Sequence, residues 1–155
     1  MIAYAATSFL VSLYGSDPHT AAAIAEVRRN KPVFVVTPLT ELEFTNALEL
    51  RVFHREFSAR EARAVLGEFM QDLRGGVIRI EGLPTELFVL ARRLSRAHTV
   101  KAGTRSLDIL HVASAVLLRP DVFYSFDERQ RRLAAAAGLV VRPSHFLLDK
   151  PLDQR

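Results

Sequence analysis

The sequence predicts an α/β protein with a central parallel sheet of about five short strands and helices on both faces of that sheet. Short apolar runs such as Val33–Val36 lack polar alternation, which is typical of strands buried on both faces. Segments with helical spacing of apolar residues separate these runs, and each is long enough for the crossover that parallel strands require. A chain of 155 residues is expected to form one domain with its own core.

The expected strands are short, and Gly, Pro or the cap of a helix follows each of them closely. They lie at residues 2–6, 33–36, 77–80, 122–125 and 139–141.

The expected helices begin at capping residues and end near Gly or Pro. They lie at about 8–15, 17–27, 37–53, 58–74, 84–94, 109–118 and 129–137. Asp17 followed by Pro18 is a typical helix start, and Ser58 with Glu61 forms a capping box. Residues 96–105 are expected to be a basic loop, and residues 144–155 a C-terminal tail after a domain at 1–143.

Composition restricts the classes of function. The chain contains no cysteine, which excludes disulfides, thiolate catalysis and zinc fingers, and which fits a reducing cytoplasm. No apolar run reaches the length of about 20 residues that spans a bilayer, and no signal peptide is apparent, so we expect no membrane segment. The net charge of +4, carried mostly by arginine, is compatible with a nucleic-acid partner or with an arginine-rich genome.

Chemically capable side chains follow the carboxyl ends of the expected strands, where α/β proteins bind ligands. They are Thr7 and Ser8 after the first strand, Glu43 and Asn46 on the helix after the second, Ser125 and Asp127 after the fourth, and Asp108 at the start of the apolar helix. Asp108 and Asp127 each have the simpler interpretation of a helix cap, and Glu43 that of a solvated helix residue. Three carboxylates at one edge would instead need a cation, and oxygen ligands without cysteine favour Mg²⁺ or Mn²⁺. Such an ion with an activated water hydrolyses phosphodiesters.

The chain resembles PIN-domain ribonucleases, and among them the VapC toxins of bacterial toxin–antitoxin pairs, over roughly residues 1–143. Four segments carry the resemblance: IAYAATSFLVSLY, TPLTELEFTNAL, SLDILHVASAVLL and FYSFDERQRRLAAAAGLVV. The resemblance implies a PIN-like fold and a Mg²⁺- or Mn²⁺-dependent endoribonuclease whose acidic set includes Glu43, Asp108 and Asp127. It also implies that cleavage leaves a 3′-hydroxyl and a 5′-phosphate.

Position 6 departs from the family pattern, because Ala6 stands where the family has an aspartate that binds the metal. The resemblance assigns Asp108 to the metal, Asp127 to direct or water-mediated binding, and Glu43 to a second ion or the water. Thr7, Ser8, Asn46 and Ser125 would support these carboxylates. Because the other motif positions are intact, we interpret Ala6 as an inactivating change. The alternative is a natural, non-catalytic PIN-fold module that binds RNA or protein.

The resemblance further implies partners. The substrate would be RNA of the transfer or ribosomal class, a VapB-type antitoxin would neutralise the protein, and the protein would form a homodimer. Residues 8–70 are the expected surface for the antitoxin and dimer contacts. We interpret His111 as a packed, hydrogen-bonded core residue, and Arg92, Arg93 and Arg96 as a solvated helix face.

Overall fold

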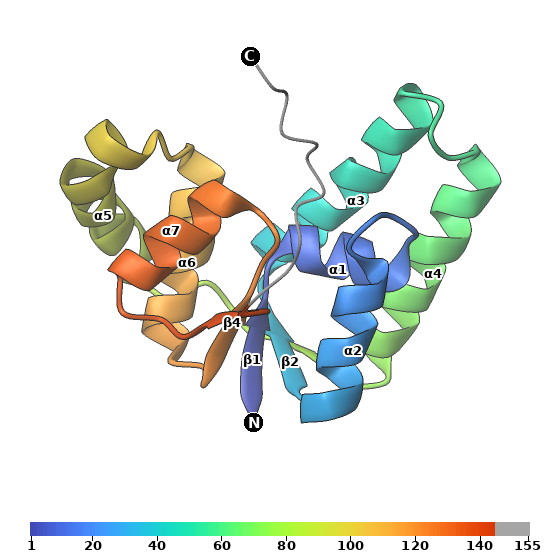
Figure 1. Ribbon diagram of the computed structural model, residues 1–155, viewed down its shortest axis with the longest axis horizontal. Helices are drawn as coiled ribbons and strands as arrows, with labels where there is room; N and C mark the ends of the chain where they lie inside the picture. The colour runs from blue at the N-terminus through green and yellow to red at the C-terminus, as the bar shows by residue number, and fades with distance from the viewer. Residues whose placement is uncertain (145–155) are drawn as a thin grey trace, which may run out of the picture.

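The computed structural model describes residues 1–144, and the expected tail lies outside them apart from residue 144. Five parallel strands form one sheet in the order β3-β2-β1-β4-β5. The strands are β1 (Ile2–Ala5), β2 (Val33–Val36), β3 (Ile78–Ile80), β4 (Val122–Tyr124) and β5 (Val141–Arg142). The predicted fold class and strand number are confirmed (Figure 1).

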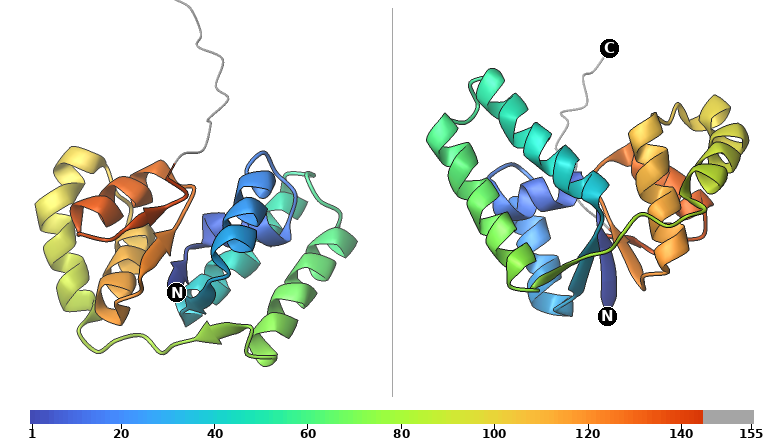
Figure 2. Two further views of the ribbon diagram at one scale, coloured as in Figure 1. Left: turned by 60° about the horizontal axis from the view of Figure 1, so that its bottom comes forward. Right: turned by 180° about the vertical axis from the view of Figure 1, so that it is seen from behind.

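Seven helices connect the strands of the described part of the chain. They are α1 (Thr7–Tyr14), α2 (Thr20–Asn30), α3 (Pro38–Phe53), α4 (Ala59–Arg74), α5 (Leu87–Ala102), α6 (Ser106–Leu118) and α7 (Glu128–Ala136). Helices α1 to α4 lie on one side of the sheet and α5 to α7 on the other (Figures 1 and 2).

Alternation along β1 explains why the sheet carries helices on both faces. Ala3 and Ala5 point into the core shared with α1 to α4, whereas Tyr4 points into the core shared with α5 to α7. Both sets of side chains are completely buried, as expected for a central parallel strand.

The expected basic loop at 96–105 is wrong, because α5 continues to Ala102. Leu94 remains buried in the core, and the Arg, Ala and Lys residues that follow are good helix formers. Gly103 ends the helix in the left-handed conformation that glycine adopts without steric cost, with φ of 61°. The loop before α6 is therefore short, and it holds Arg105 at the start of that helix.

Four helix starts and one strand also differ from expectation. Helix α5 begins at Leu87 rather than at residue 84, and α6 begins at Ser106 rather than at residue 109. Helix α2 begins at Thr20 rather than Asp17, because the Asp17 carboxylate accepts a hydrogen bond from the His19 backbone and anchors the preceding turn. Helix α1 begins at Thr7, with Ala6 rather than Ser8 in the capping position. Strand β5 pairs only at Val141–Arg142, one residue beyond the expected end. No helix within residues 1–144 is long and apolar enough to cross a membrane.

Candidate active site

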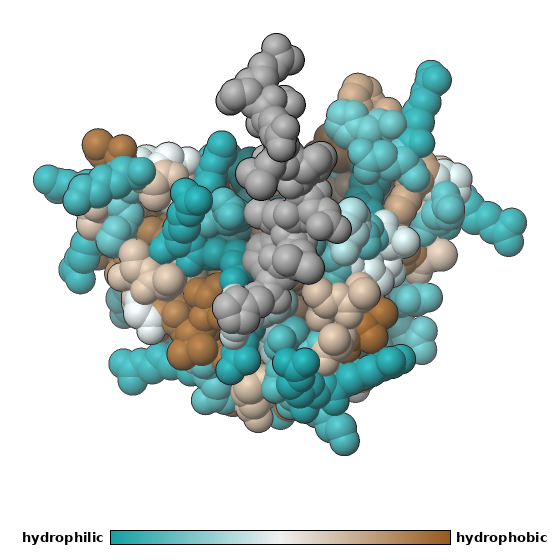
Figure 3. Space-filling model, viewed as in Figure 1, coloured by the Kyte–Doolittle hydropathy of each residue, from teal (hydrophilic) through white to brown (hydrophobic). Residues whose placement is uncertain are grey.

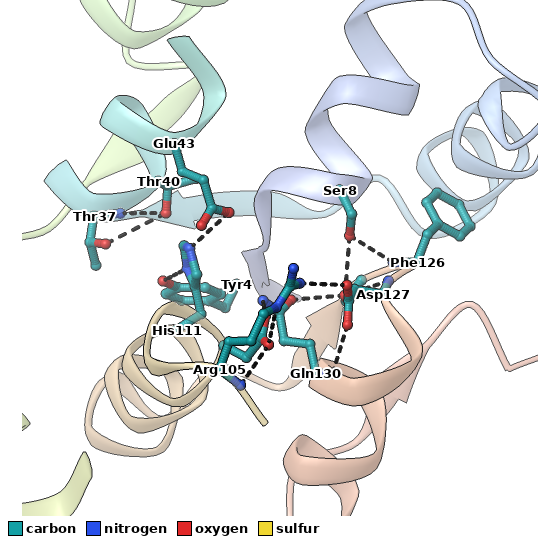
Figure 4. A network of polar contacts seen from close by, with 12 residues as sticks. Tyr4, Ser8, Thr37, Thr40, Glu43, Arg105, His111, Phe126, Asp127 and Gln130 are labelled. Atoms are coloured by element: carbon teal, nitrogen blue, oxygen red, sulfur yellow. Dashed lines mark hydrogen bonds and ion pairs between the residues drawn. The ribbon is translucent and has the colours of Figure 1, made fainter. Parts of the chain in front are cut away.

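A pocket of about 430 Å³ lies beyond the carboxyl ends of β1 and β4. Helices α1, α3 and α6 and the start of α7 bring together residues that are more than a hundred positions apart in the chain (Figure 4). The lining residues are Thr7, Ser8, Glu43, Arg105, Ser106, Leu107, Asp108, Asp127 and Gln130. Five of the side chains expected at this edge of the sheet therefore line one pocket.

Asp108 is nearly buried, with 4% of its surface exposed, and its burial depends on hydrogen bonds. It is the third residue of α6 rather than its cap, and Oδ2 accepts hydrogen bonds from the backbone N and from Nε of Arg105, both at 3.2 Å. Nε2 of Gln130 lies 3.4 Å from the other oxygen. The hydrogen bond and charge of Asp108 raise the pKa of Arg105, which favours the charged guanidinium.

Asp127 caps α7, as its simpler interpretation predicted. Its Oδ1 accepts the backbone N–H of Gln130 at 2.9 Å. Its Oδ2 lies 3.3 Å from an Nη atom of Arg105. One guanidinium therefore bridges Asp108 and Asp127, and it holds the two carboxylates at the same side of the pocket.

A chain of hydroxyl and amide groups fixes the floor of the pocket. The Ser8 hydroxyl lies 3.2 Å from that of Ser125, which donates to Oε1 of Gln130 at 2.9 Å. Ser8 also accepts the backbone N–H of Phe126 at 3.0 Å. Because Gln130 reaches Asp108, this chain links the start of α1 to the carboxylate on α6. The chain is thus placed to orient Asp108.

Glu43 lies on the opposite side of the pocket, against a buried imidazole (Figure 4). Nε2 of His111 is 3.3 Å from Oε1 of Glu43, and Nδ1 is 2.8 Å from the hydroxyl of Tyr4. His111 is completely buried, so the interpretation of it as a packed, hydrogen-bonded residue agrees with the structure. Burial acts to raise the pKa of Glu43, but His111, Thr7 and Arg105 together outweigh it, and the pKa is lowered.

The structure separates the candidate residues into two groups. Thr7, Ser8, Glu43, Asp108 and Asp127 line the pocket. Three others do not: Ala6 is buried at the start of α1, Asn46 is exposed on α3, and Ser125 lies buried beneath the lining.

Sequence reasoning missed Arg105 and Gln130 as members of the site. Arg105 stands three residues before Asp108, and Gln130 three residues after Asp127. This is the spacing at which residues at a helix start contact one another, so the positions of both were signals in the sequence.

The carboxylates are the right kind of ligand for Mg²⁺ or Mn²⁺, but they form an incomplete set. Within residues 1–144, no three acidic or histidine side chains lie close enough together to hold a metal ion. Asp108 and Asp127 share a guanidinium, and position 6 supplies only a methyl group. These side chains are thus of the type that binds a divalent cation, but there are too few of them to form a complete site.

Comparison with known families decides the class of this fold. The family model of the PIN domain matches residues 4–136. The chain belongs to the PIN domain family. A comparison with curated proteins gave no match.

Several solved PIN-fold structures are similar to the chain at low sequence identity. VapC20 from Mycobacterium tuberculosis, a toxin that cleaves the sarcin-ricin loop, has a TM-score of 0.67 and 22% identity, covering 89% of this chain and 96% of that one. VapBC2 from Rickettsia felis, bound to a DNA fragment from the promoter, has a TM-score of 0.64 and 12% identity, covering 91% and 97%. The FitAcB structure from Neisseria gonorrhoeae has a TM-score of 0.64 and 14% identity, covering 90% and 96%. The predicted PIN-like fold is confirmed.

Proposed function

We propose that this PIN-domain protein is a VapC-like, metal-dependent endoribonuclease toxin in which Ala6 impairs activity. The observation that carries the proposal is the pocket itself, where Glu43, Asp108 and Asp127 line one hollow of a PIN fold. VapC20, which is similar in fold, is described as a toxin that cleaves RNA at the sarcin-ricin loop. Transfer or ribosomal RNA is therefore the proposed class of substrate.

Asp108 and Asp127 would hold Mg²⁺ or Mn²⁺, with Glu43 at a second ion or at the attacking water, once position 6 supplies an acidic ligand. The bound ion would supply an activated water and neutralise charge on the phosphate. The chain's own residues prepare this arrangement. Ser8, Ser125 and Gln130 orient Asp108.

Arg105 occupies the position of a counter-ion in the chain as it stands. Its guanidinium pairs with both Asp108 and Asp127 and offsets part of their charge, while its side chain remains 63% exposed. Such a group can turn from the carboxylates toward a phosphate oxygen when a metal binds, because arginine pairs with both kinds of oxyanion.

An antitoxin of the VapB type is the proposed protein partner. Similar structures are described as VapBC2 and FitAcB. Within the expected contact surface of residues 8–70, helix α3 exposes Leu42, Leu50 and Phe53, which a partner would cover. We further propose that the protein forms a homodimer and is located in the cytoplasm.

The test compares the chain with its Ala6→Asp variant, both purified without antitoxin and incubated with total RNA in Mn²⁺ or in EDTA. We expect cleavage only by the variant and only with metal, and adding Asp108→Asn should abolish it. Cleavage in EDTA would contradict the metal mechanism, and undiminished cleavage after Asp108→Asn would remove that residue from the site.

A non-catalytic PIN module is the second candidate, and Ala6 together with the Arg105 bridge favours it. Under this alternative, Ala6→Asp gains neither cleavage nor Mn²⁺ affinity, although the chain still binds RNA or a co-expressed antitoxin. Failure to co-purify with the cognate antitoxin would count against the toxin assignment.

A further inference from the structure

Two shallow depressions extend the candidate active site along helix α5, which packs against α6 (Figures 1 and 2). The first, of about 310 Å³, lies between the two helices and is lined by Phe88, Arg92, Ser95, Ser106, Ile109 and Leu110, among others. The second, of about 500 Å³, is lined by Val89, Arg92, Arg93, Arg96 and Ala97.

Shared lining residues place these hollows next to one another and next to the carboxylate pocket. Ser106 lines both the carboxylate pocket and the depression between α5 and α6. Arg92 lines both that depression and the outer one. The two depressions together form a surface that adjoins the carboxylate pocket at Ser106 and follows α5 with its arginines; we call this surface the α5 track.

The charge on α5 is of one sign. Its 16 residues include Arg92, Arg93, Arg96 and Lys101 and no acidic residue. The three arginines are exposed, and none forms an ion pair with another residue in the described part of the chain. Figure 3 shows long hydrophilic side chains projecting from the side of the molecule that carries α5, with apolar ones beside them.

Helix α4, on the other side of the sheet, has a different pattern. It has the same length and also carries three arginines, Arg60, Arg63 and Arg74. Acidic residues on the same helix balance them: Glu61, Glu68 and Asp72. The unbalanced charge of α5 is thus a local property and does not follow from the arginine content of the chain alone.

Apolar side chains accompany the arginines in both depressions: Phe88 lines the one between α5 and α6, and Val89 the outer one. Phe88 and Val89 are 60% and 52% exposed, although they begin a helix whose Leu87 is completely buried. An exposed aromatic ring among guanidinium groups suits a single nucleic-acid strand, because bases stack on the ring while the guanidinium groups bind phosphates. An acidic peptide would use the arginines but gain little from the aromatic ring.

We propose that the α5 track binds the single-stranded RNA segment that flanks the scissile phosphate, with Phe88 stacking on a base and Arg92, Arg93 and Arg96 contacting phosphates. This inference rests on the proposed function, since it takes the carboxylate pocket as the place of the reacting phosphodiester. The track then determines on which side of the scissile phosphate the protein binds the RNA, and it requires that the RNA on this side be single-stranded.

The test measures binding rather than cleavage, so the chain with Ala6 serves as the parent. A short fluorescein-labelled single-stranded RNA of mixed sequence is titrated by fluorescence anisotropy at several salt concentrations. We expect the combined change Arg92→Gln, Arg93→Gln and Arg96→Gln to weaken binding by tenfold or more, on the order of the loss of three phosphate contacts. The slope of log affinity against log salt should fall by up to about 2, at roughly 0.7 for each contact.

The matched control changes Arg60, Arg63 and Arg74 of α4 to Gln, which removes the same net charge. We expect its affinity to stay within about twofold of the parent. Phe88→Ala should weaken binding by about fivefold or more with no change in salt slope, because it removes stacking and not charge. Circular dichroism of each variant establishes that it is folded.

Three outcomes would overturn the proposal. Equal losses in the α4 and α5 variants would show attraction by net charge alone, and unchanged binding in the α5 variant would exclude the track. Displacement of the RNA by polyglutamate at equal concentration would indicate an acidic protein ligand. If Ala6→Asp cleaves RNA while the α5 variants bind normally, the track fails and the nuclease stands. If the α5 variants lose RNA but Ala6→Asp does not cleave, the nuclease fails and the track stands.

Discussion

Replacing Ala6 by aspartate should couple the stability of the protein to divalent metal. The pocket presently holds three carboxylates, Glu43, Asp108 and Asp127, and one guanidinium from Arg105. Ala6 is completely buried at the start of α1, and no side chain caps that helix. A new carboxylate there would cap α1 but would add a charge to a cluster that is already negative.

The Ala6→Asn variant isolates the effect of the added charge, because asparagine has nearly the same size as aspartate and also caps helices but is neutral. At an effective dielectric constant of about 20, two charges about 6 Å apart interact by about 3 kcal/mol. The open pocket screens part of this, so without metal we expect Ala6→Asp to be less stable than Ala6→Asn by about 2 kcal/mol.

Mn²⁺ should reverse this order. A ligand at about a hundred times its Kd stabilises the folded state by about 2.7 kcal/mol. For a chain of this size, that corresponds to a rise in Tm of about 5 to 10 °C. Only Ala6→Asp should show it, whereas Ala6→Asn and the parent should respond little.

Thermal denaturation followed by circular dichroism, with Mn²⁺ or EDTA, provides the measurement. Equal responses of Ala6→Asp and Ala6→Asn to Mn²⁺ would refute the reasoning, because the added charge would then have no part in metal binding. A loss of folding in both variants would show that position 6 has no room for a larger side chain, and the pocket would then not be a disabled metal site.

Three further predictions follow from the same structure. Arg105→Met should lower the free energy of unfolding by only about 1 kcal/mol, because the guanidinium is largely exposed. In the Ala6→Asp background the same change should tighten Mn²⁺ binding, because it frees Asp108. Isothermal calorimetry measures the Mn²⁺ affinity, and Arg105→Lys is the control. His111→Leu should lower the free energy of unfolding by about 1 to 3 kcal/mol, because it leaves the Tyr4 hydroxyl without this partner. In a double-mutant cycle measured by chemical denaturation, adding Tyr4→Phe should restore part of that free energy. Burial is the largest cause of a raised pKa at all three tyrosines, so absorbance near 295 nm should show less tyrosinate at pH 10 in the folded protein than in the unfolded one. Because the unfolded tyrosines ionise near pH 10, this contribution to stability is complete below that pH and is lost as the pH rises above it.

Local sequence patterns predicted most of the fold because each element carries its own signal. The buried run Val33–Val36 forms β2 with the expected bounds, and the capping box of Ser58 and Glu61 starts α4 as expected. The density of basic residues suggests a loop after residue 94, but α5 continues to Ala102, and Gly103 marks its end. Charge density alone does not end a helix when the residues are good helix formers.

The site was only partly predictable, because its contacts join segments that no local pattern connects. Carboxylates after parallel strands predicted that Asp108 and Asp127 would meet, but not that Arg105 would bridge them. That bridge depends on the tertiary placement of α7 against α6, which a one-dimensional pattern does not contain. The same applies to His111, whose two partners come from β1 and α3.

The arginines of α5 show most clearly how structure changes an interpretation. In the sequence, Arg92, Arg93 and Arg96 are typical of a solvated helix face, and their exposure alone agrees with that. Exposure alone does not distinguish these residues, however; they line two depressions, the inner of which shares Ser106 with the carboxylate pocket. An acidic pocket by itself repels RNA, so a nuclease needs neighbouring cations to bring the phosphate backbone to the carboxylates. Since α4 has the same number of arginines but neutralises them, it is the distribution of acidic residues, and not of basic ones, that singles out α5 as the side from which a strand would approach.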